Sequence, residues 1–283
     1  MKKKIIAFTI LTLCLFGFAF TVQAADGYYQ EISSFGDNDY VKLDFDGDGK
    51  NEVLEVFTDN YTADNSGVLK TYIEILIDGK VVFSNNANGY SVLNGYYIEM
   101  GNGERLFMLS VIGENDYTHL SGLYTLNSAH KLQRIANIRS IERGAWTHIG
   151  LSPWKITVGN SSLKILCSTQ LGGIGRVNYT IPYTIKGGKA TLSSKNFLLN
   201  HRYSSNRNNW TVSRSFTGYT KAYRGRKVFT VQIGQKAKIS YIYFGATYAY
   251  AKVQIAQNGK LKTGWVKLPN SDKTYFREAY YAA

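Results

Sequence analysis

An alternation of apolar and polar side chains runs through most of this chain, and it limits the possible folds more than any other feature. The alternation has the period of two that β-strands show, whereas an amphipathic helix needs a period near 3.6. In residues 72–83, YIEILIDGKVVF, two alternating runs flank Asp78-Gly79, a pair that favours a tight hairpin turn. Asn258-Gly259 is a second strong turn signal. The chain is therefore predicted to be all-β with antiparallel sheets.

Two segments depart from simple alternation. Residues 105–113, RLFMLSVIG, form a continuous apolar run, which is typical of a strand buried on both faces. Leu132, Ile135, Ile138 and Ile141 recur every three residues, a spacing that fits either one short helix or a strand with a bulge. The sequence leaves this second choice open.

The first 24 residues have the features of a secretory signal. Three lysines at positions 2–4 precede an apolar run at 5–20, and Val22 and Ala24 place small residues where a signal peptidase inspects the chain. The run is shorter than the roughly 20 residues of a membrane-spanning helix, so cleavage after Ala24 is predicted instead of an anchor. The remaining chain has no other long apolar run and only Cys167, so we expect a secreted protein without an integral membrane segment or an internal disulfide.

The two halves of the secreted chain carry opposite charge. Residues 25–150 have a net charge of −9, and residues 151–283 have a net charge of +19. An acidic half suits cations and a basic half suits a polyanion. For a secreted protein we expect an anionic wall polymer or phospholipid headgroups as partners, and not nucleic acid. The alternatives are that the halves attract each other or that the charge only maintains solubility.

The most specific motif is an acidic loop between two strand-like segments. Its carboxylates alternate along the chain, and Gly47 and Gly49 permit the tight turn that aims their oxygens at one point. The predicted ligands of a hard cation are the side chains of Asp44, Asp46, Asp48 and Glu52 and the carbonyl oxygen of Lys50. Calcium is the predicted ion, with the weak affinity of about 10⁻⁴ to 10⁻³ M typical of extracellular modules. The alternative is an acidic surface turn without a metal.

The stretch from Asp44 to Glu55 also satisfies the spacing of an EF-hand. The flanking segments YVKL and EVLEVF alternate as strands do, so they cannot supply the two amphipathic helices that an EF-hand requires. A strand-loop-strand arrangement is therefore predicted. In that arrangement the bound ion would stiffen the turn and take no part in catalysis.

Residues 25–199 resemble FG-GAP and VCBS propeller-type repeats. The resemblance rests on the acidic loop, DFDGDGKNEV, on the ILIDGK hairpin that follows it, and on the segment GGIGRVNYTIPYTI. The resemblance implies a calcium-stabilised region. One calcium loop is too few for a closed propeller, so the expected fold is a partial, propeller-like stack of antiparallel sheets.

Residues 215–283 resemble a bacterial SH3 (SH3b) domain through IGQKAKI at 233–239 and NGKLKTGWVKL at 258–268. This implies a small SH3-like β-barrel, with the polar residues 200–214 as the linker before it. Trp265 stands where such domains often present an aromatic ring to a ligand. Alternation in YAYAKVQI places Tyr250 and Lys252 on the face opposite the core, which makes them the other candidate ligand-binding residues.

The combined resemblance implies a secreted cell-envelope protein whose SH3-like module contacts peptidoglycan or another wall polymer without a covalent link. Two other functions stay open. One is a cell-wall hydrolase that the module targets to its substrate, and the other is a non-specific polyanion-binding protein, whose affinity would fall steeply with salt.

The sequence offers no catalytic motif. The histidines at 119, 130, 148 and 201 lack the spacing of a shared metal site, and no GxSxG nucleophile motif occurs. Cys167 alternates with core-type residues and is predicted to be a small buried hydrophobe. A dispersed acid pair such as Asp116 with Glu142 is conceivable, but no feature of the sequence selects it. No catalytic residue is therefore predicted.

Overall fold

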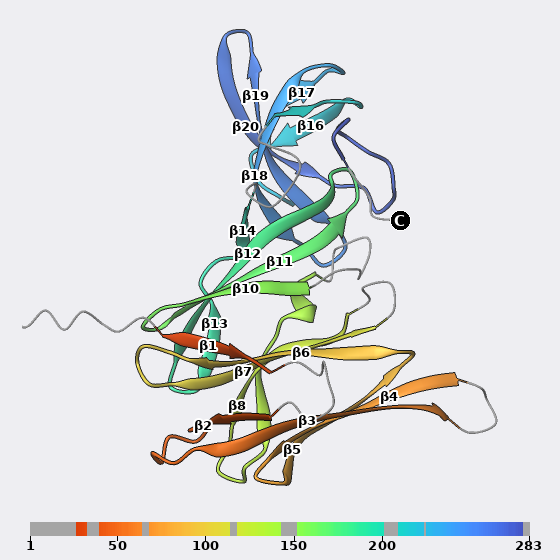
Figure 1. The fold of residues 1–283 in the computed structure, drawn as a ribbon. Coiled ribbons are helices and arrows are strands. Elements are labelled where there is room, and N and C mark those ends of the chain that lie inside the picture. Colours follow the sequence, from red (N-terminus) through yellow and green to blue (C-terminus); the bar gives the residue numbers. More distant parts are fainter. Residues whose placement is uncertain are drawn as a thin grey trace, which may run out of the picture.

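The structure is a computed structural model that describes residues 27–32, 40–63, 68–113, 118–142, 152–200, 209–223 and 225–279. The predicted signal segment 1–24, Asp116, His148 and His201 lie outside these ranges. The described residues form β-strands in three sheets and contain no α-helix (Figure 1). No helix in these ranges has the length and apolar character needed to cross a membrane.

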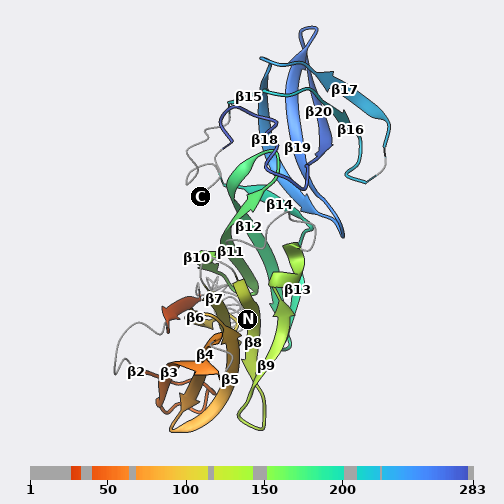
Figure 2. The same cartoon turned by 90° about the vertical axis from the view of Figure 1, so that its right-hand side faces the viewer.

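A four-stranded sheet with the order β2-β3-β4-β5 lies at one end of the elongated molecule (Figures 1 and 2). Its strands are β2 (Tyr40–Leu43), β3 (Glu52–Ala63), β4 (Val68–Ile77) and β5 (Lys80–Asn88). Asp78 and Gly79 form the predicted turn between β4 and β5, both with positive φ. The hairpin prediction is therefore confirmed.

A five-stranded sheet with the order β1-β6-β7-β8-β9 packs against the first. Its strands are β1 (Tyr28–Glu31), β6 (Ser91–Glu99), β7 (Arg105–Gly113), β8 (Thr118–Leu126) and β9 (Leu132–Asn137), and the 3-10 helix η3 (Arg139–Glu142) follows. The apolar spacing that began at Leu132 thus covers a strand and then one short helical turn. Strand β9 itself carries a bulge at Ile135, which lies unpaired between Arg134 and Ala136, so each alternative accounts for part of the segment.

The third sheet is the largest and continues through the second half of the chain. Its first strands are β10 (Ser152–Val158), β11 (Ser162–Leu171), β12 (Gly175–Lys186), β13 (Lys189–Leu192) and β14 (Asn196–Leu199). The others are β15 (Trp210–Thr211), β16 (Phe216–Tyr219), β17 (Lys227–Val231), β18 (Lys236–Phe244), β19 (Ala249–Gln257) and β20 (Lys260–Lys267). Strand β14 pairs with β12 on one side and β18 on the other, so the sheet crosses the predicted domain boundary without a break.

The five-stranded sheet is buried on both faces. Along β7, Phe107, Leu109 and Val111 pack into the core shared with the four-stranded sheet, while Leu106 and Met108 belong to the core shared with the third sheet. Because both faces need apolar side chains, the strand reads as a continuous apolar run, as predicted. Three sheets are thus stacked, and the basic strands extend away from the far end of the stack (Figure 1).

The all-β, antiparallel fold class is confirmed, since every pair of named strands is antiparallel. No sheet of the described residues closes into a barrel. Of the segment predicted as a linker, Trp210 and Val212 are buried, and β15 pairs with β18. The domain boundaries and the propeller-like and SH3-like assignments stay predictions.

Candidate functional site

The acidic loop connects β2 to β3, in a strand-loop-strand arrangement as predicted. Its own carboxylates hold its shape. The amides of Gly47 and Gly49 donate to Asp44 at 2.6 and 3.1 Å, and the amide of Lys50 donates to Asp48 at 2.8 Å. Both glycines have φ near +90°, a conformation that side chains with a Cβ rarely adopt. The loop is thus a tight turn that directs several carboxylates inward.

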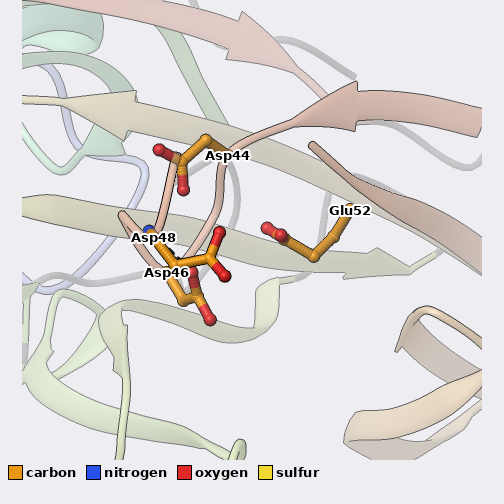
Figure 3. A group of neighbouring side chains, drawn as sticks. All are labelled: Asp44, Asp46, Asp48 and Glu52. Atoms are coloured by element: carbon orange, nitrogen blue, oxygen red, sulfur yellow. Dashed lines mark hydrogen bonds between the residues drawn. The ribbon is translucent and has the colours of Figure 1, made fainter. Parts of the chain in front are cut away.

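Four of the predicted ligands converge. One oxygen each from Asp44, Asp46, Asp48 and Glu52 lies within 4.8 Å of every other, and Figure 3 shows the four side chains around one space. Calcium ligands lie 2.3–2.6 Å from the ion, so oxygens on opposite sides are about 4.6–5.2 Å apart. The corresponding span for magnesium is about 4.2 Å. Both spans are compatible with the 4.8 Å limit, so the cluster could hold a metal ion.

The loop is anchored to the core beneath it. The amide of Phe45 donates to the Glu52 carboxylate at 2.7 Å, and the Phe45 ring is buried against Tyr97 and Phe107. The Tyr97 hydroxyl donates to the carbonyl oxygen of Asp44 at 3.1 Å. Burial raises the pKa of Tyr97 far above its usual value, which keeps the hydroxyl a neutral donor. The loop therefore sits on a rigid aromatic base.

Arg105 is the cation beside this loop that the sequence analysis missed. Its guanidinium lies 3.5 Å from the Asp44 carboxylate and 4.0 Å from that of Glu99. Burial acts to lower the pKa of Arg105, but the charges of its neighbours outweigh this effect and raise it, so the group stays charged. Arg105 thereby offsets part of the repulsion among the carboxylates and links the loop to β7. No sequence pattern could point to Arg105 as a neighbour of the loop, because 61 residues separate it from Asp44.

Two hollows of about 310 and 360 Å³ flank the loop. Both are lined by Phe45, Asp46, Leu126 and His130. The first lies between the β4–β5 turn and the β8–β9 turn, and the second lies between Gly103, Arg105 and the β8–β9 turn. An ion in the loop would therefore stay accessible to water on this side. Lys50, whose carbonyl was predicted as a ligand, directs its side chain into solvent beside Asp48 at 3.5 Å.

The C-terminal candidates lie on one face of the sheet. Directly paired residues of antiparallel strands share a face, and pairing joins Tyr241 to Lys252, Lys252 to Trp265 and Trp265 to Tyr219. The neighbouring row is Tyr243, Tyr250 and Lys267. We call these seven residues the aromatic–lysine face. The opposite face of the same strands is buried and carries Ile239, Ile242, Ala251, Val253 and Val266.

The predicted candidates differ in exposure within this face. Trp265 and Lys252 are half-buried, whereas Tyr250 is only 8% exposed because Tyr223 and Tyr243 pack against it at ring distances of 5.3 and 6.2 Å. The sequence analysis missed Tyr219 and Tyr223, which are 41% and 57% exposed. Tyr250 thus supports the surface from below, and Tyr219 and Tyr223 supply more of its accessible ring area.

Lysine ammonium groups lie over aromatic rings in this region. The Lys252 nitrogen is 5.5 Å from the ring centre of Tyr241, and the Lys267 nitrogen is 3.2 Å from that of Tyr248. These are cation–π contacts, which hold a lysine in place without neutralising it. A hydrogen bond to Tyr223 and burial raise the pKa of Tyr243 to about 12, so its hydroxyl stays neutral at physiological pH. The lysines therefore provide the charge of this face.

Of the residues considered for catalysis, the structure describes His119, His130, Glu142 and Cys167. Cys167 is a buried cysteine with no exposed surface, as predicted. Burial and the charge of Arg139 lower the pKa of His119, which favours a neutral imidazole. His130 lines the hollows beside the acidic loop and has a positive φ.

Comparisons with known proteins found no matching protein family, no matching curated protein and no matching solved structure.

Proposed function

We propose that this protein is a secreted, cell-envelope-associated binding protein, stabilised by calcium, whose C-terminal module contacts peptidoglycan or another wall polymer. The aromatic–lysine face carries this proposal. Exposed rings beside unneutralised lysines suit polymers with sugar rings and anionic groups, and the face gathers them across four strands. The signal-like residues 1–24 support export.

We also propose the architecture that the resemblances imply. Strands β1–β14, within residues 25–199, would form the partial, propeller-like region, and β16–β20, within residues 215–283, would form the SH3-like module. Support comes from the strand-loop-strand setting of the acidic loop and from the position of Trp265 on the outer face of β20. Within this architecture, calcium would bind Asp44, Asp46, Asp48 and Glu52, and the ion would replace mutual repulsion by shared coordination.

Sedimentation with wall material tests the function. The chain from Ala25 is mixed with intact walls and with peptidoglycan freed of anionic polymers, across a salt series. We expect the protein to sediment with walls even at about 0.5 M NaCl, where binding by charge alone is largely lost. Point variants are preferable to truncation, because β14 and β15 share a sheet with β18.

Two variants complete this test. Trp265→Ala should reduce the sedimented fraction, and Tyr40→Ala, which removes an exposed ring from the four-stranded sheet, should not. Binding that disappears with modest salt would favour a non-specific polyanion binder instead. Release of soluble wall fragments during the incubation would favour the hydrolase.

A further inference from the structure

The charge of the aromatic–lysine face excludes one class of ligand. Strands β16–β20 contain no aspartate or glutamate, and the chain after residue 150 contains only Asp272 and Glu278. Glu278 accepts hydrogen bonds from the amide and hydroxyl of Thr211 at 2.7 and 2.6 Å, so its carboxylate is already engaged. No carboxylate of these strands can therefore pair with an amine, so the face suits an anion and disfavours a cationic peptide.

The placement of the aromatic rings suits a chain of several sugars better than a single sugar. Tyr241, Lys252, Trp265 and Tyr219 follow one another on four adjacent strands. Neighbouring strands are about 4.8 Å apart, so this row extends for about 14 Å across the sheet. Rings stand at both ends of the row and a cation stands between them. A polymer with alternating ring surfaces and negative groups would match that order.

The face is held in place before any ligand arrives. Tyr223 packs edge-on against Tyr243, and Tyr243 packs in the same way against Trp265 at 6.3 Å. The Tyr243 hydroxyl also donates to that of Tyr223 at 3.2 Å. Side chains that are already ordered lose little conformational entropy on binding. This order favours a ligand-binding role for the face over a role in solubility alone.

From these observations we infer that the aromatic–lysine face binds an acidic glycan. Sugar rings would stack on Trp265 and Tyr219, and carboxylate or phosphate groups of the glycan would meet Lys252 and Lys267. This inference rests on the proposed wall-binding function and names the class of polymer that the same face recognises.

Titration calorimetry with defined polymers tests the inference. The probes share one backbone: carboxymethyl dextran, dextran phosphate and unmodified dextran. Poly-L-glutamate supplies charge without sugar rings, and poly(dT) represents single-stranded nucleic acid. At about 0.15 M NaCl, we expect the better of the two charged dextrans to bind about tenfold or more tighter than dextran, poly-L-glutamate or poly(dT). Comparison of the two charged dextrans distinguishes carboxylate from phosphate recognition.

Matched variants assign the binding to this face. Trp265→Ala, Tyr219→Ala and Lys252→Gln should each weaken binding of the preferred dextran about tenfold. Lys260→Gln removes the same charge at the β19–β20 turn, and its effect should stay within about twofold. Tyr219→Ala also protects the test against misfolding, because Tyr219 is exposed and its loss leaves the core intact.

Three results would overturn the inference. They are equal binding of unmodified dextran, tighter binding of poly(dT), or equal effects of Lys252→Gln and Lys260→Gln. If walls bind in the sedimentation experiment but neither charged dextran binds here, the proposed function stands and only the glycan class is wrong. If walls do not bind either, the proposed function fails as well.

Discussion

The acidic stack, strands β1–β9, and the basic sheet, strands β16–β20, present their candidate sites in different ways. The acidic loop takes four carboxylates from nine consecutive positions, residues 44–52. The aromatic–lysine face takes its residues from four strands that span positions 219–267. The first site depends on local turn geometry, and the second depends on the register of long-range pairing.

The two regions also treat charge differently. In the loop, like charges crowd together. Among the described residues, only Arg105 and Lys50 form ion pairs with its carboxylates. A divalent cation should therefore stabilise this region. In the basic sheet, Lys252 and Lys267 lie over aromatic rings, and neither takes part in the ion pairs found among the described residues. Calcium should affect the first region and a polymer should affect the second.

The largest expected effect concerns Trp210, which lies in the segment that joins β14 to the basic sheet. A defect at this position should disturb both regions. Trp210 is 1% exposed and packs against Phe276 at 5.3 Å. Trp210→Ala should lower the free energy of unfolding by about 3–5 kcal/mol, because it leaves a large cavity. Trp210→Phe is the control and should cost less, since the indole N–H has no hydrogen-bond partner among the described residues. Urea unfolding measures both, and equal costs would contradict this account of the packing.

Calcium should act on the acidic stack alone. At about 10 mM calcium and the expected weak affinity, binding should add about 1.4–2.7 kcal/mol of stability. The melting temperature should then rise by about 3–10 °C. A variant with Asp46→Asn and Asp48→Asn should lose this rise, while Lys252→Gln should keep it. A rise of the same size with sodium at matched ionic strength would refute specific binding.

Substitutions of Gly47 and Gly49 test how Arg105 contributes to the acidic loop. A Cβ on Gly49 would meet open space, whereas a Cβ on Gly47 would collide with the Arg105 guanidinium. Gly49→Ala should cost about 1 kcal/mol through its positive φ, and Gly47→Ala should cost more because Arg105 must also move. Thermal melting without calcium measures the difference. Equal losses would show that Arg105 contributes nothing to the loop.

The smallest effect concerns acid stability in the basic half. Burial alone would raise the pKa of Glu278, but hydrogen bonds from Thr211 and the charge of Lys236 lower it below its usual value. A depressed carboxylate pKa contributes stability that is present above the unfolded-state pKa and is lost as the pH falls through the folded-state pKa. Glu278→Gln should therefore destabilise the protein by about 1 kcal/mol near neutral pH and by less at low pH. A loss that does not change with pH would contradict this origin.

The convergence of the acidic loop's carboxylates and the strand pattern could be predicted from sequence because both depend on near neighbours. The face could be predicted only in part. A bulge at Ser240 shifts the register between Ile239 and Tyr241, so Lys238 and Tyr241 share a face although strict alternation would separate them. Tyr219 joins the face by pairing with Trp265, which no local pattern shows.

The burial of Trp210 could not be predicted, for a similar reason. Residues 200–210 are polar and almost free of aliphatic side chains, which is typical of a linker. Burial of Trp210 depends on contact with Phe276 and on pairing with β18, both remote in sequence. Local composition therefore gave no sign that Trp210 and Val212 join the core.

One measurement tests the division of roles most directly: the fraction of protein that sediments with intact walls at about 0.5 M NaCl. It compares the unmodified chain, Trp265→Ala, and the Asp46→Asn, Asp48→Asn double variant, all below their melting temperatures. The account predicts that only Trp265→Ala loses most of its binding. Equal loss in the double variant, or full binding by Trp265→Ala, would contradict it.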